Sequence, residues 1–157
     1  MVSRQLSRRL FFAVIALLIG VPAGFGLTGA VFCNATLRVK KTRSPTPVGA
    51  VVVSIRARDQ ANLSAWWMKA SKPNGNCVVL LHGIKDSRAS SLQFAPLFLS
   101  EGYDVLLPDI RAHGASEGQF VTYGMMEKYD VLAWADWMKD TGCQRLYALG
   151  ESLGAAV

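Results

Sequence analysis

Near its carboxyl end the sequence runs Leu146-Tyr147-Ala148-Leu149-Gly150-Glu151-Ser152-Leu153-Gly154. A short apolar run therefore leads directly into the pattern G-x-S-x-G. A serine in this pattern can lie on a sharp turn between a strand and a helix, with its hydroxyl exposed for nucleophilic attack. The glycines two residues before and after the serine make room for that turn, because a Cβ at either place would clash. We therefore take Ser152 as a candidate nucleophile; the alternative is a helix N-cap, where serine is also favoured.

The charge is distributed very unevenly along the chain. The 157 residues carry a net charge of +6, and 51% of them are hydrophobic. Residues 1–43 contain seven basic residues and no acidic one, whereas residues 44–157 contain ten basic and eleven acidic residues. No basic stripe is left over in residues 44–157 to neutralise phosphates, so the sequence argues against a nucleic-acid-binding protein.

The basic residues of the amino-terminal part flank an apolar segment, Leu10 to Phe32. As a helix its 23 residues would span about 34 Å, against roughly 30 Å of membrane hydrocarbon. A cleaved signal peptide is the alternative, with Arg8-Arg9 before its apolar region and Thr28-Gly29-Ala30 as the cleavage site. Because the apolar stretch is longer than a normal signal peptide needs, we expect residues 1–37 to form an uncleaved membrane anchor.

The rest of the chain is predicted to be a linker followed by an α/β domain. Residues 38–49 contain two prolines and several charges, which favour an extended, solvated linker. In residues 50–157, short apolar runs alternate with helical patterns, which is typical of a parallel sheet flanked by helices. We expect strands over residues 50–57, 63–69, 77–81, 104–109 and 145–149, and helices over 90–100, 123–141 and from Leu153 onward.

Three motifs, each following a predicted strand, resemble those of the α/β-hydrolases. They are Leu80-Leu81-His82-Gly83, the loop Asp109-Ile110-Arg111-Ala112-His113-Gly114-Ala115-Ser116-Glu117-Gly118, and Gly150-Glu151-Ser152-Leu153-Gly154. Within that superfamily the motifs look most like those of the serine-aminopeptidase-like and monoacylglycerol-lipase-like hydrolases. The resemblance covers residues 50–157 and implies the α/β-hydrolase fold, a mostly parallel sheet flanked by helices and truncated after the nucleophile elbow.

The resemblance also implies a role for each motif residue. Ser152 would be the catalytic nucleophile, and the backbone N–H groups of Ile84 and Leu153 would form the oxyanion hole. His82 would shape the oxyanion loop and His113 would hold the 109–118 loop by hydrogen bonds, neither acting as the base. The remaining loop-supporting residues are Gly83, Asp109, Arg111, Gly150 and Gly154, with Asp109 and Arg111 expected to order the loop as a pair. Trp66, Trp67, Trp134 and Trp137 are expected in the core or covering the sheet. The helical carboxylates of Asp130 and Asp136 are expected to cap, pair or face solvent.

The acid and the base of a catalytic triad are absent from this sequence. In the α/β-hydrolases the triad follows the order Ser, then Asp or Glu, then His. No histidine follows Ser152. The resemblance therefore implies that these residues are the amino-terminal part of a longer hydrolase, with a further strand beside residues 145–149. On that interpretation the 157 residues alone lack triad catalysis.

Three cysteines are too few for a disulfide framework. Cys77 begins one predicted strand and Cys143 precedes another, and the two could be buried or semi-buried thiols. In the sheet of the α/β-hydrolases, however, the strands at residues 78–81 and 146–149 are parallel neighbours. That resemblance places the two sulfur atoms close together, at the edge opposite the active site. We expect a disulfide there if the domain lies in an oxidising compartment.

These observations predict a single-pass, membrane-anchored serine hydrolase with an extracytoplasmic catalytic domain. It would cleave an ester, thioester or amide through an acyl-enzyme on Ser152, with a small acyl or peptide substrate and the membrane, via residues 10–32, as partners. No metal, organic cofactor or nucleic acid is expected. The alternative function is a non-catalytic membrane-tethered fragment or pseudoenzyme. A different reaction on the same fold, such as dehalogenation, requires a carboxylate at the position of Ser152. The sequence therefore argues against it.

Overall fold

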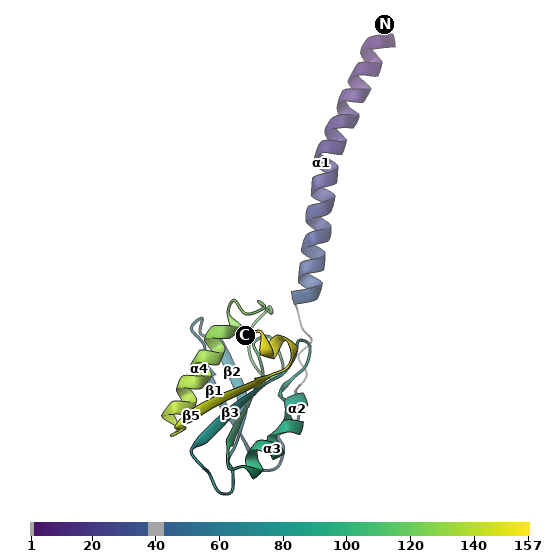
Figure 1. Cartoon of the computed structure of the whole chain (residues 1–157). Coiled ribbons are helices and arrows are strands. Elements are labelled where there is room, and N and C mark those ends of the chain that lie inside the picture. The colour runs from purple at the N-terminus through teal and green to yellow at the C-terminus, as the bar shows by residue number, and fades with distance from the viewer. Residues whose placement is uncertain (1, 38–42) are drawn as a thin grey trace. The chain divides into compact units, whose positions relative to one another are not determined.

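The computed structural model describes residues 2–37 and 43–157, which belong to two units divided after Leu37 (Figure 1). The first unit is one helix, α1 (Val2–Leu37), with Pro22 inside it. Its window Val14–Val31 has a mean hydropathy of 2.1 and none of its residues is buried. By length and composition this helix could cross a membrane, although a signal sequence passes the same test. Both alternatives for the amino-terminal segment therefore remain open.

The second unit contains a five-stranded mixed sheet. Its strands are β1 (Ala50–Arg56), β2 (Asn62–Met68), β3 (Asn76–Leu81), β4 (Asp104–Pro108) and β5 (Arg145–Gly150), in the order β1-β2-β4-β3-β5. The pairs β1–β2 and β2–β4 are antiparallel, and the pairs β4–β3 and β3–β5 are parallel. Strands β1, β4, β3 and β5 therefore run in one direction and β2 runs against them, so the described sheet is mostly parallel, as expected, with one antiparallel strand. The connection between β1 and β2 is only residues 57–61, and a connection that short cannot join parallel strands.

The helices are shorter than the sequence patterns predict. The expected helix over residues 90–100 is divided into α2 (Arg88–Ser91), a 3₁₀ turn η1 (Leu92–Phe94) and α3 (Ala95–Ser100), which has a proline in its first turn. The expected helix over residues 123–141 begins later, as α4 (Glu127–Asp140). Tyr123 and Gly124 have φ angles of 48° and 95°, which no right-handed helix accepts. The segment after β5 is a 3₁₀ turn, η2 (Ser152–Ala155).

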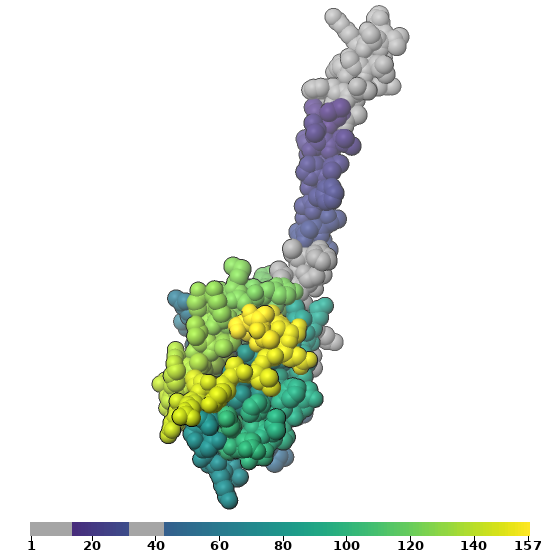
Figure 2. All heavy atoms as spheres, viewed as in Figure 1, coloured from purple at the N-terminus to yellow at the C-terminus, as the bar shows by residue number. Residues whose placement is uncertain are grey.

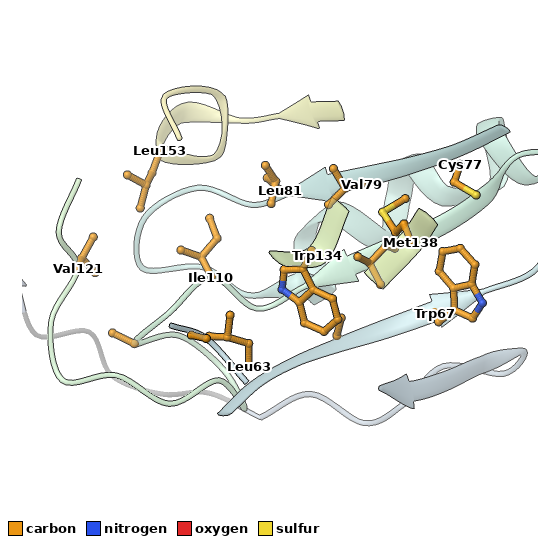
Figure 3. Packing of buried hydrophobic residues seen from close by; sticks show 14 residues of the cluster. Leu63, Trp67, Cys77, Val79, Leu81, Ile110, Val121, Trp134, Met138 and Leu153 are labelled. Atoms are coloured by element: carbon orange, nitrogen blue, oxygen red, sulfur yellow. The ribbon is translucent and has the colours of Figure 1, made fainter. Parts of the chain in front are cut away.

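Apolar side chains cover both faces of the sheet. Helix α4 covers one face, where Trp134 and Met138 pack against Trp67, Val79 and other buried residues (Figure 3). The segment from α2 to α3 covers the opposite face, which contains the buried Trp66 (Figure 1). The prediction of core tryptophans is confirmed for Trp66, Trp67 and Trp134, and Trp137 is half-buried with its ring 5.3 Å from that of Trp67.

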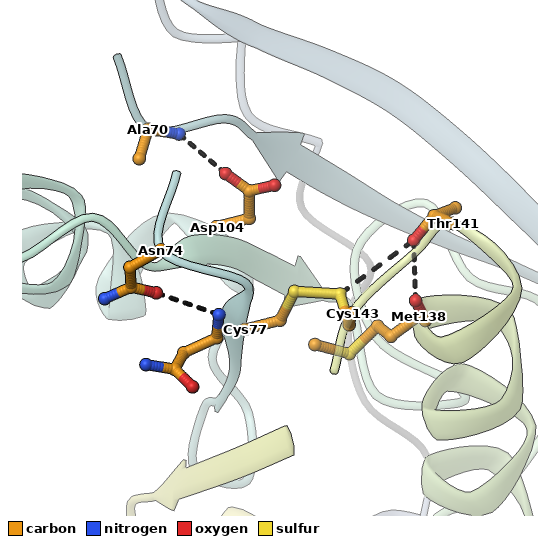
Figure 4. Close-up of a disulfide and its surroundings, with 8 residues drawn as sticks. Ala70, Asn74, Cys77, Asp104, Met138, Thr141 and Cys143 are labelled. Atoms are coloured by element: carbon orange, nitrogen blue, oxygen red, sulfur yellow. Dashed lines mark hydrogen bonds between the residues drawn. A yellow bond between two sulfur atoms is a disulfide. The ribbon is translucent and has the colours of Figure 1, made fainter. Parts of the chain in front are cut away.

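A disulfide joins the start of β3 to the loop between α4 and β5 (Figure 4). The bond links Cys77 and Cys143, whose Cα atoms are 5.8 Å apart. The pairing expected from the resemblance is therefore confirmed. Because β3 and β5 are parallel and both end near the G-x-S-x-G motif, the disulfide lies at the opposite end of these strands from Ser152.

Strand β5 is at one edge of the five-stranded sheet. In Figure 2 the yellow atoms of β5 and η2 lie uncovered on the face shown. Two large apolar side chains of this strand, Tyr147 and Leu149, are 44% and 41% exposed.

Candidate active site

The three motifs meet at one end of the sheet. Strands β4, β3 and β5 are adjacent and parallel, so their carboxyl ends share an edge. His82 follows β3, Asp109 follows β4 and Glu151 follows β5. In open α/β sheets this edge is where ligands bind. The loops 82–88, 109–118 and 150–155 therefore form the candidate site.

Ser152 lies on a tight turn between β5 and η2 and is exposed to solvent. Its φ angle of 52° is in the left-handed region, which costs a non-glycine residue about 1–2 kcal/mol. A Cβ on Gly150 would overlap the carbonyl of Gly154, and a Cβ on Gly154 would overlap the carbonyl of Leu81. Both glycines are therefore required by close backbone contacts. In the described part of the chain, the Ser152 hydroxyl makes no hydrogen bond to protein.

A second turn, Gly83–Asp86, lies against Ser152. The N–H of Asp86 donates to the carbonyl of Gly83, and the third residue of the turn, Lys85, has a φ angle of 64°. A Cβ placed on Gly83 would be 3.5 Å from the Cβ of Ser152. Ile84, the second residue of the turn, is half-buried against the core. Among hydrogen bonds between described residues, none has the backbone N–H of Ile84 or of Leu153 as its donor.

His82 is fully buried and both of its ring nitrogens are occupied. Its Nε2 lies 3.0 Å from the backbone N–H of Ile110, which can only donate, so Nε2 carries no proton. The proton is then on Nδ1, which donates to the carbonyl of Gly83 over 2.7 Å. Burial lowers the pKa of His82 below its ordinary value, which keeps the ring neutral. His82 thus holds the carbonyl of Gly83, in the turn beside Ser152.

His113 is also fully buried, and its ring centroid is 5.0 Å from that of His82. Its Nε2 accepts a hydrogen bond of 3.0 Å from the backbone N–H of Lys85. Its Nδ1 donates to the carbonyl of Arg111 over 2.9 Å. His113 thus makes one hydrogen bond within its own loop and one to the turn that follows His82.

Asp109 and Arg111 do not pair with each other, so the expectation of a loop-ordering pair is wrong. The buried Asp109 carboxylate accepts hydrogen bonds from the backbone N–H groups of Arg88 and Ala115, both at 2.8 Å. The Arg88 Nε lies 3.3 Å from the same carboxylate, close enough for an ion pair but without hydrogen-bond alignment. Each residue still orders the 109–118 loop, although through a different partner.

Arg111 binds two carboxylates at once. Its Nε and Nη2 donate to Asp130 over 2.6 and 2.7 Å, and its Nη1 donates to Asp59 over 3.0 Å. These hydrogen bonds, above all those to Asp130, raise the pKa of Arg111 above its ordinary value. The guanidinium therefore joins the loop to α4 and to the turn between β1 and β2. From the sequence, Asp130 is expected to cap the helix, pair with another residue or face solvent. That expectation does not identify Asp130 as the partner of Arg111.

Arg88 is the supporting residue that the sequence analysis missed. It is buried, its Nη1 donates to the hydroxyl of Ser64 over 3.0 Å, and its guanidinium lies 4.6 Å from the ring centroid of Trp66. In the sequence it follows Lys85-Asp86-Ser87, a polar stretch that looks like an exposed loop. No local pattern distinguishes it from a surface arginine.

An apolar pocket of about 200 Å³ opens beside the Ser152 turn. It is lined by Leu80, Leu81, Ser91, Phe94, Leu149, Gly150 and Glu151. Within residues 2–37 and 43–157, no three His, Cys, Asp or Glu side chains are grouped so as to hold a metal ion.

Curated proteins similar to this chain include two bacterial proteins, each described only as an uncharacterized protein. YqkD of Bacillus subtilis is 37% identical over 82 residues, which are 51% of this chain and 27% of YqkD. Rv2307c of Mycobacterium tuberculosis is 30% identical over 123 residues, which are 76% of this chain and 43% of that protein. The chain thus spans less than half the length of the curated relatives it matches.

Comparison with solved structures finds hydrolases. The esterase Pf2001 of Pyrococcus furiosus superposes with a TM-score of 0.69 at 30% identity, covering 75% of this chain and 50% of the esterase. An epoxide hydrolase mutant of Vigna radiata superposes with a TM-score of 0.54 at 22% identity and shares the fold. The superposition covers 68% of this chain and 32% of the epoxide hydrolase. The model of the α/β hydrolase fold family matches residues 76–157. The sheet order, the site loops and this match together place the chain in the α/β-hydrolase fold family.

Proposed function

We propose that this protein is a serine hydrolase whose nucleophile is Ser152. The observation that carries the proposal is an exposed serine in a left-handed conformation, on a turn that two glycines permit at the carboxyl edge of the sheet. The family is one of hydrolases with this fold, and the Pyrococcus relative is described as an esterase. These findings support hydrolysis of an ester, thioester or amide, with an ester as the first substrate class to test.

In the proposed reaction the Ser152 oxygen attacks the carbonyl carbon of the substrate while its proton passes to a base. The resulting oxyanion accepts hydrogen bonds from the N–H groups of Ile84 and Leu153, which have no protein acceptor among the described residues. The base then gives this proton to the leaving group, and collapse of the intermediate releases the alcohol, thiol or amine and leaves an ester on Ser152. Water then attacks that ester, releasing the carboxylic acid and restoring the serine.

The base of this reaction is proposed to come from residues outside the sequence described here. The chain has two histidines. In both His82 and His113, one ring nitrogen accepts from a backbone N–H and the other donates to a carbonyl. Neither ring is free to take the Ser152 proton, so a third histidine and its partnering carboxylate are required.

The apolar pocket beside Ser152 supports a substrate with a small acyl group. Phe94 and Leu149 provide apolar surface, and Gly150 and Glu151 place the pocket next to the nucleophile. The acyl chain would lie against these side chains while the carbonyl faces the Ile84 turn.

We also propose that α1 anchors the protein in a membrane, with residues 43–157 in an oxidising compartment. The apolar window of α1 supports an anchor. The disulfide supports the compartment, because such bonds persist mainly outside the reducing cytosol.

Labelling of the full-length protein with a fluorophosphonate probe tests the nucleophile. The wild type and a Ser100→Ala control should be labelled, because Ser100 is an exposed serine whose hydroxyl donates only to the nearby carbonyl of Leu97. Ser152→Ala should lose all labelling. Labelling that survives in Ser152→Ala would exclude Ser152 as nucleophile, and a wild type that is never labelled would favour the non-catalytic alternative.

A further inference from the structure

We propose that His113 is a positioning residue that sets the direction of the Ile84 backbone N–H, the donor to the oxyanion. This inference rests on the proposed function, since it assigns a role within the same site. His113 follows a different strand from Ile84 and is 29 positions away in the sequence. It reaches the turn through one hydrogen bond, from the N–H of Lys85 to Nε2.

The two peptide groups that flank the Cα of Ile84 are each held by a histidine. The first contains the carbonyl of Gly83 and the N–H of Ile84, and its carbonyl accepts from His82 Nδ1 over 2.7 Å. The second contains the carbonyl of Ile84 and the N–H of Lys85, which donates to His113 Nε2 over 3.0 Å. In a trans peptide the C=O and N–H point in opposite directions. Fixing the Gly83 carbonyl therefore aims the Ile84 N–H, and fixing the next peptide prevents rotation about the Ile84 Cα.

His113 is itself rigidly mounted. Its Nδ1 donates to the carbonyl of Arg111, and its own backbone N–H donates to the carbonyl of Ile110. Arg111 is in turn held by the buried carboxylate of Asp130. A rigid support is what a positioning residue needs, because an acceptor that moved with the turn would constrain nothing.

Lys85, at one end of the His113 contact, and the residue that precedes His113 are in unfavourable backbone conformations. Lys85 and Ala112, the residue before His113, have φ angles of 64° and 63°. Such angles cost free energy in residues other than glycine, and the surrounding contacts must offset that cost. The ring of His113 is fully buried, so water does not compete for Nε2. Loss of this acceptor is therefore expected to release the turn.

Hydrogen exchange in the full-length protein tests the contact without requiring activity. His113→Phe keeps an aromatic ring but removes the acceptor, and we expect exchange of the Lys85 and Asp86 amides, which both donate hydrogen bonds in this turn, to become at least about tenfold faster. His113→Gln can place an oxygen near the Nε2 position and should restore most of the protection. Asp104→Ala is the matched control, because it removes a partly buried hydrogen bond, donated by the N–H of Ala70, at the other end of β4. Unchanged exchange of residues 83–87 in His113→Phe would overturn the inference.

The wild type provides a second test if His113→Phe does not fold. Nitrogen-15 spectra should show His113 protonated on Nδ1 and unprotonated on Nε2, and the amide of Lys85 should exchange slowly. An Nε2-protonated ring, or a Lys85 amide that exchanges as in an unstructured loop, would contradict the proposed contact.

Ester hydrolysis with p-nitrophenyl acetate tests the effect on catalysis. His113→Phe should lower kcat by about 10- to 100-fold with KM nearly unchanged, which is less than complete removal of an oxyanion donor. His113→Gln should recover most of kcat, and Asp104→Ala should leave it unchanged. An equal loss of kcat in Asp104→Ala would reduce His113 to a general stabilising residue.

The two proposals fail in different ways. A wild type whose turnover does not depend on Ser152 disproves the serine mechanism. Exchange data that show no role for His113 in the 83–87 turn disprove the positioning role, whatever the activity.

Discussion

Individual buried side chains in this domain make hydrogen bonds to backbone groups that have no partner in a strand or helix. The two histidines each accept from one N–H and donate to one carbonyl, and Asp109 accepts from two N–H groups. A buried backbone group without a partner costs free energy, so these side chains allow irregular loops to pack tightly next to the core. At this scale the site depends on a few atoms whose replacements can be tested one at a time.

Gly154 is expected to be the less replaceable of two glycines near Ser152. A Cβ at Gly154 would overlap backbone of Leu81 and His82, whereas a Cβ at Gly83 would make an ordinary contact of 3.5 Å. Gly154→Ala should therefore destabilise the domain by about 3 kcal/mol, and Gly83→Ala by much less. Denaturant unfolding of both variants measures the difference. Equal stabilities would show that the turn after Ser152 relaxes freely.

The stability of the domain should depend on pH through His82. Burial lowers its pKa in the folded state below the ordinary 6.5. Below about pH 6.5 the unfolded chain therefore binds more protons than the folded one. The contribution of neutral His82 to the free energy of unfolding should therefore be fully present above this pH. It should decrease as the pH drops toward the lowered pKa. Unfolding between pH 7.5 and 5 measures the profile, and His82→Gln should flatten it, because glutamine does not titrate. A wild-type profile as flat as that of the variant would contradict the prediction.

Whole elements are connected through the Arg111 guanidinium. Its bonds to Asp130 and Asp59 link the 109–118 loop to α4 and to the turn after β1. A loop that is anchored to a helix packed on the sheet keeps a fixed position relative to the strands. The same loop carries His113, so this ion pair indirectly supports the Ile84 turn.

Removal of one partner of this ion pair should be costly. Asp130→Ala leaves a buried guanidinium with only Asp59, so we expect a loss of about 3 kcal/mol in the free energy of unfolding. Asp136→Ala is the control on the same helix, because its pair with Lys139 is exposed and should contribute less than about 0.5 kcal/mol. Adding Arg111→Met to Asp130→Ala should recover part of the loss. An Asp130→Ala variant as stable as Asp136→Ala would show that the ion pair adds nothing.

The disulfide joins β3 to the loop between α4 and β5 across 66 residues of sequence. Closing a loop of that length in the unfolded chain is expected to contribute about 4 kcal/mol. The double variant Cys77→Ala/Cys143→Ala should therefore melt at a lower temperature than the wild type. A reductant should lower the melting temperature of the wild type and leave that of the variant unchanged. Insensitivity of the wild type to reductant would argue against a stabilising bond.

At the scale of the whole molecule, the disulfide and the apolar helix α1 make one joint prediction. If α1 is an anchor and residues 43–157 lie outside the cytosol, an exposed thiol in the domain should react in intact cells. Lys72→Cys provides such a thiol, in the turn between β2 and β3. We expect a membrane-impermeant maleimide to label it without lysis. Labelling only after lysis would place the domain in the cytosol and contradict the proposed orientation.

The sequence by itself determined the local elements of the fold and the order of the motifs. Apolar runs between turn residues located all five strands to within a few residues. Strands β2, β3 and β4 are buried, and a strand buried on both faces is nearly continuously apolar. Glycines around Ser152 predicted a tight turn, because only they tolerate the close backbone contacts found there. The helix boundaries were predicted less well, because Tyr123 adopts a left-handed φ angle that cannot be predicted from its residue type.

Only the tertiary structure decided which charged and polar groups meet. Arg88 rather than Arg111 contacts Asp109, Arg111 binds Asp130, and His113 reaches across to Lys85. Each of these contacts joins segments far apart in the sequence, and local patterns carry no information about which buried donor finds which acceptor. Burial makes the pairing selective, since an unpaired polar group in the interior is costly, but the geometry that satisfies every group exists only once the strands are side by side.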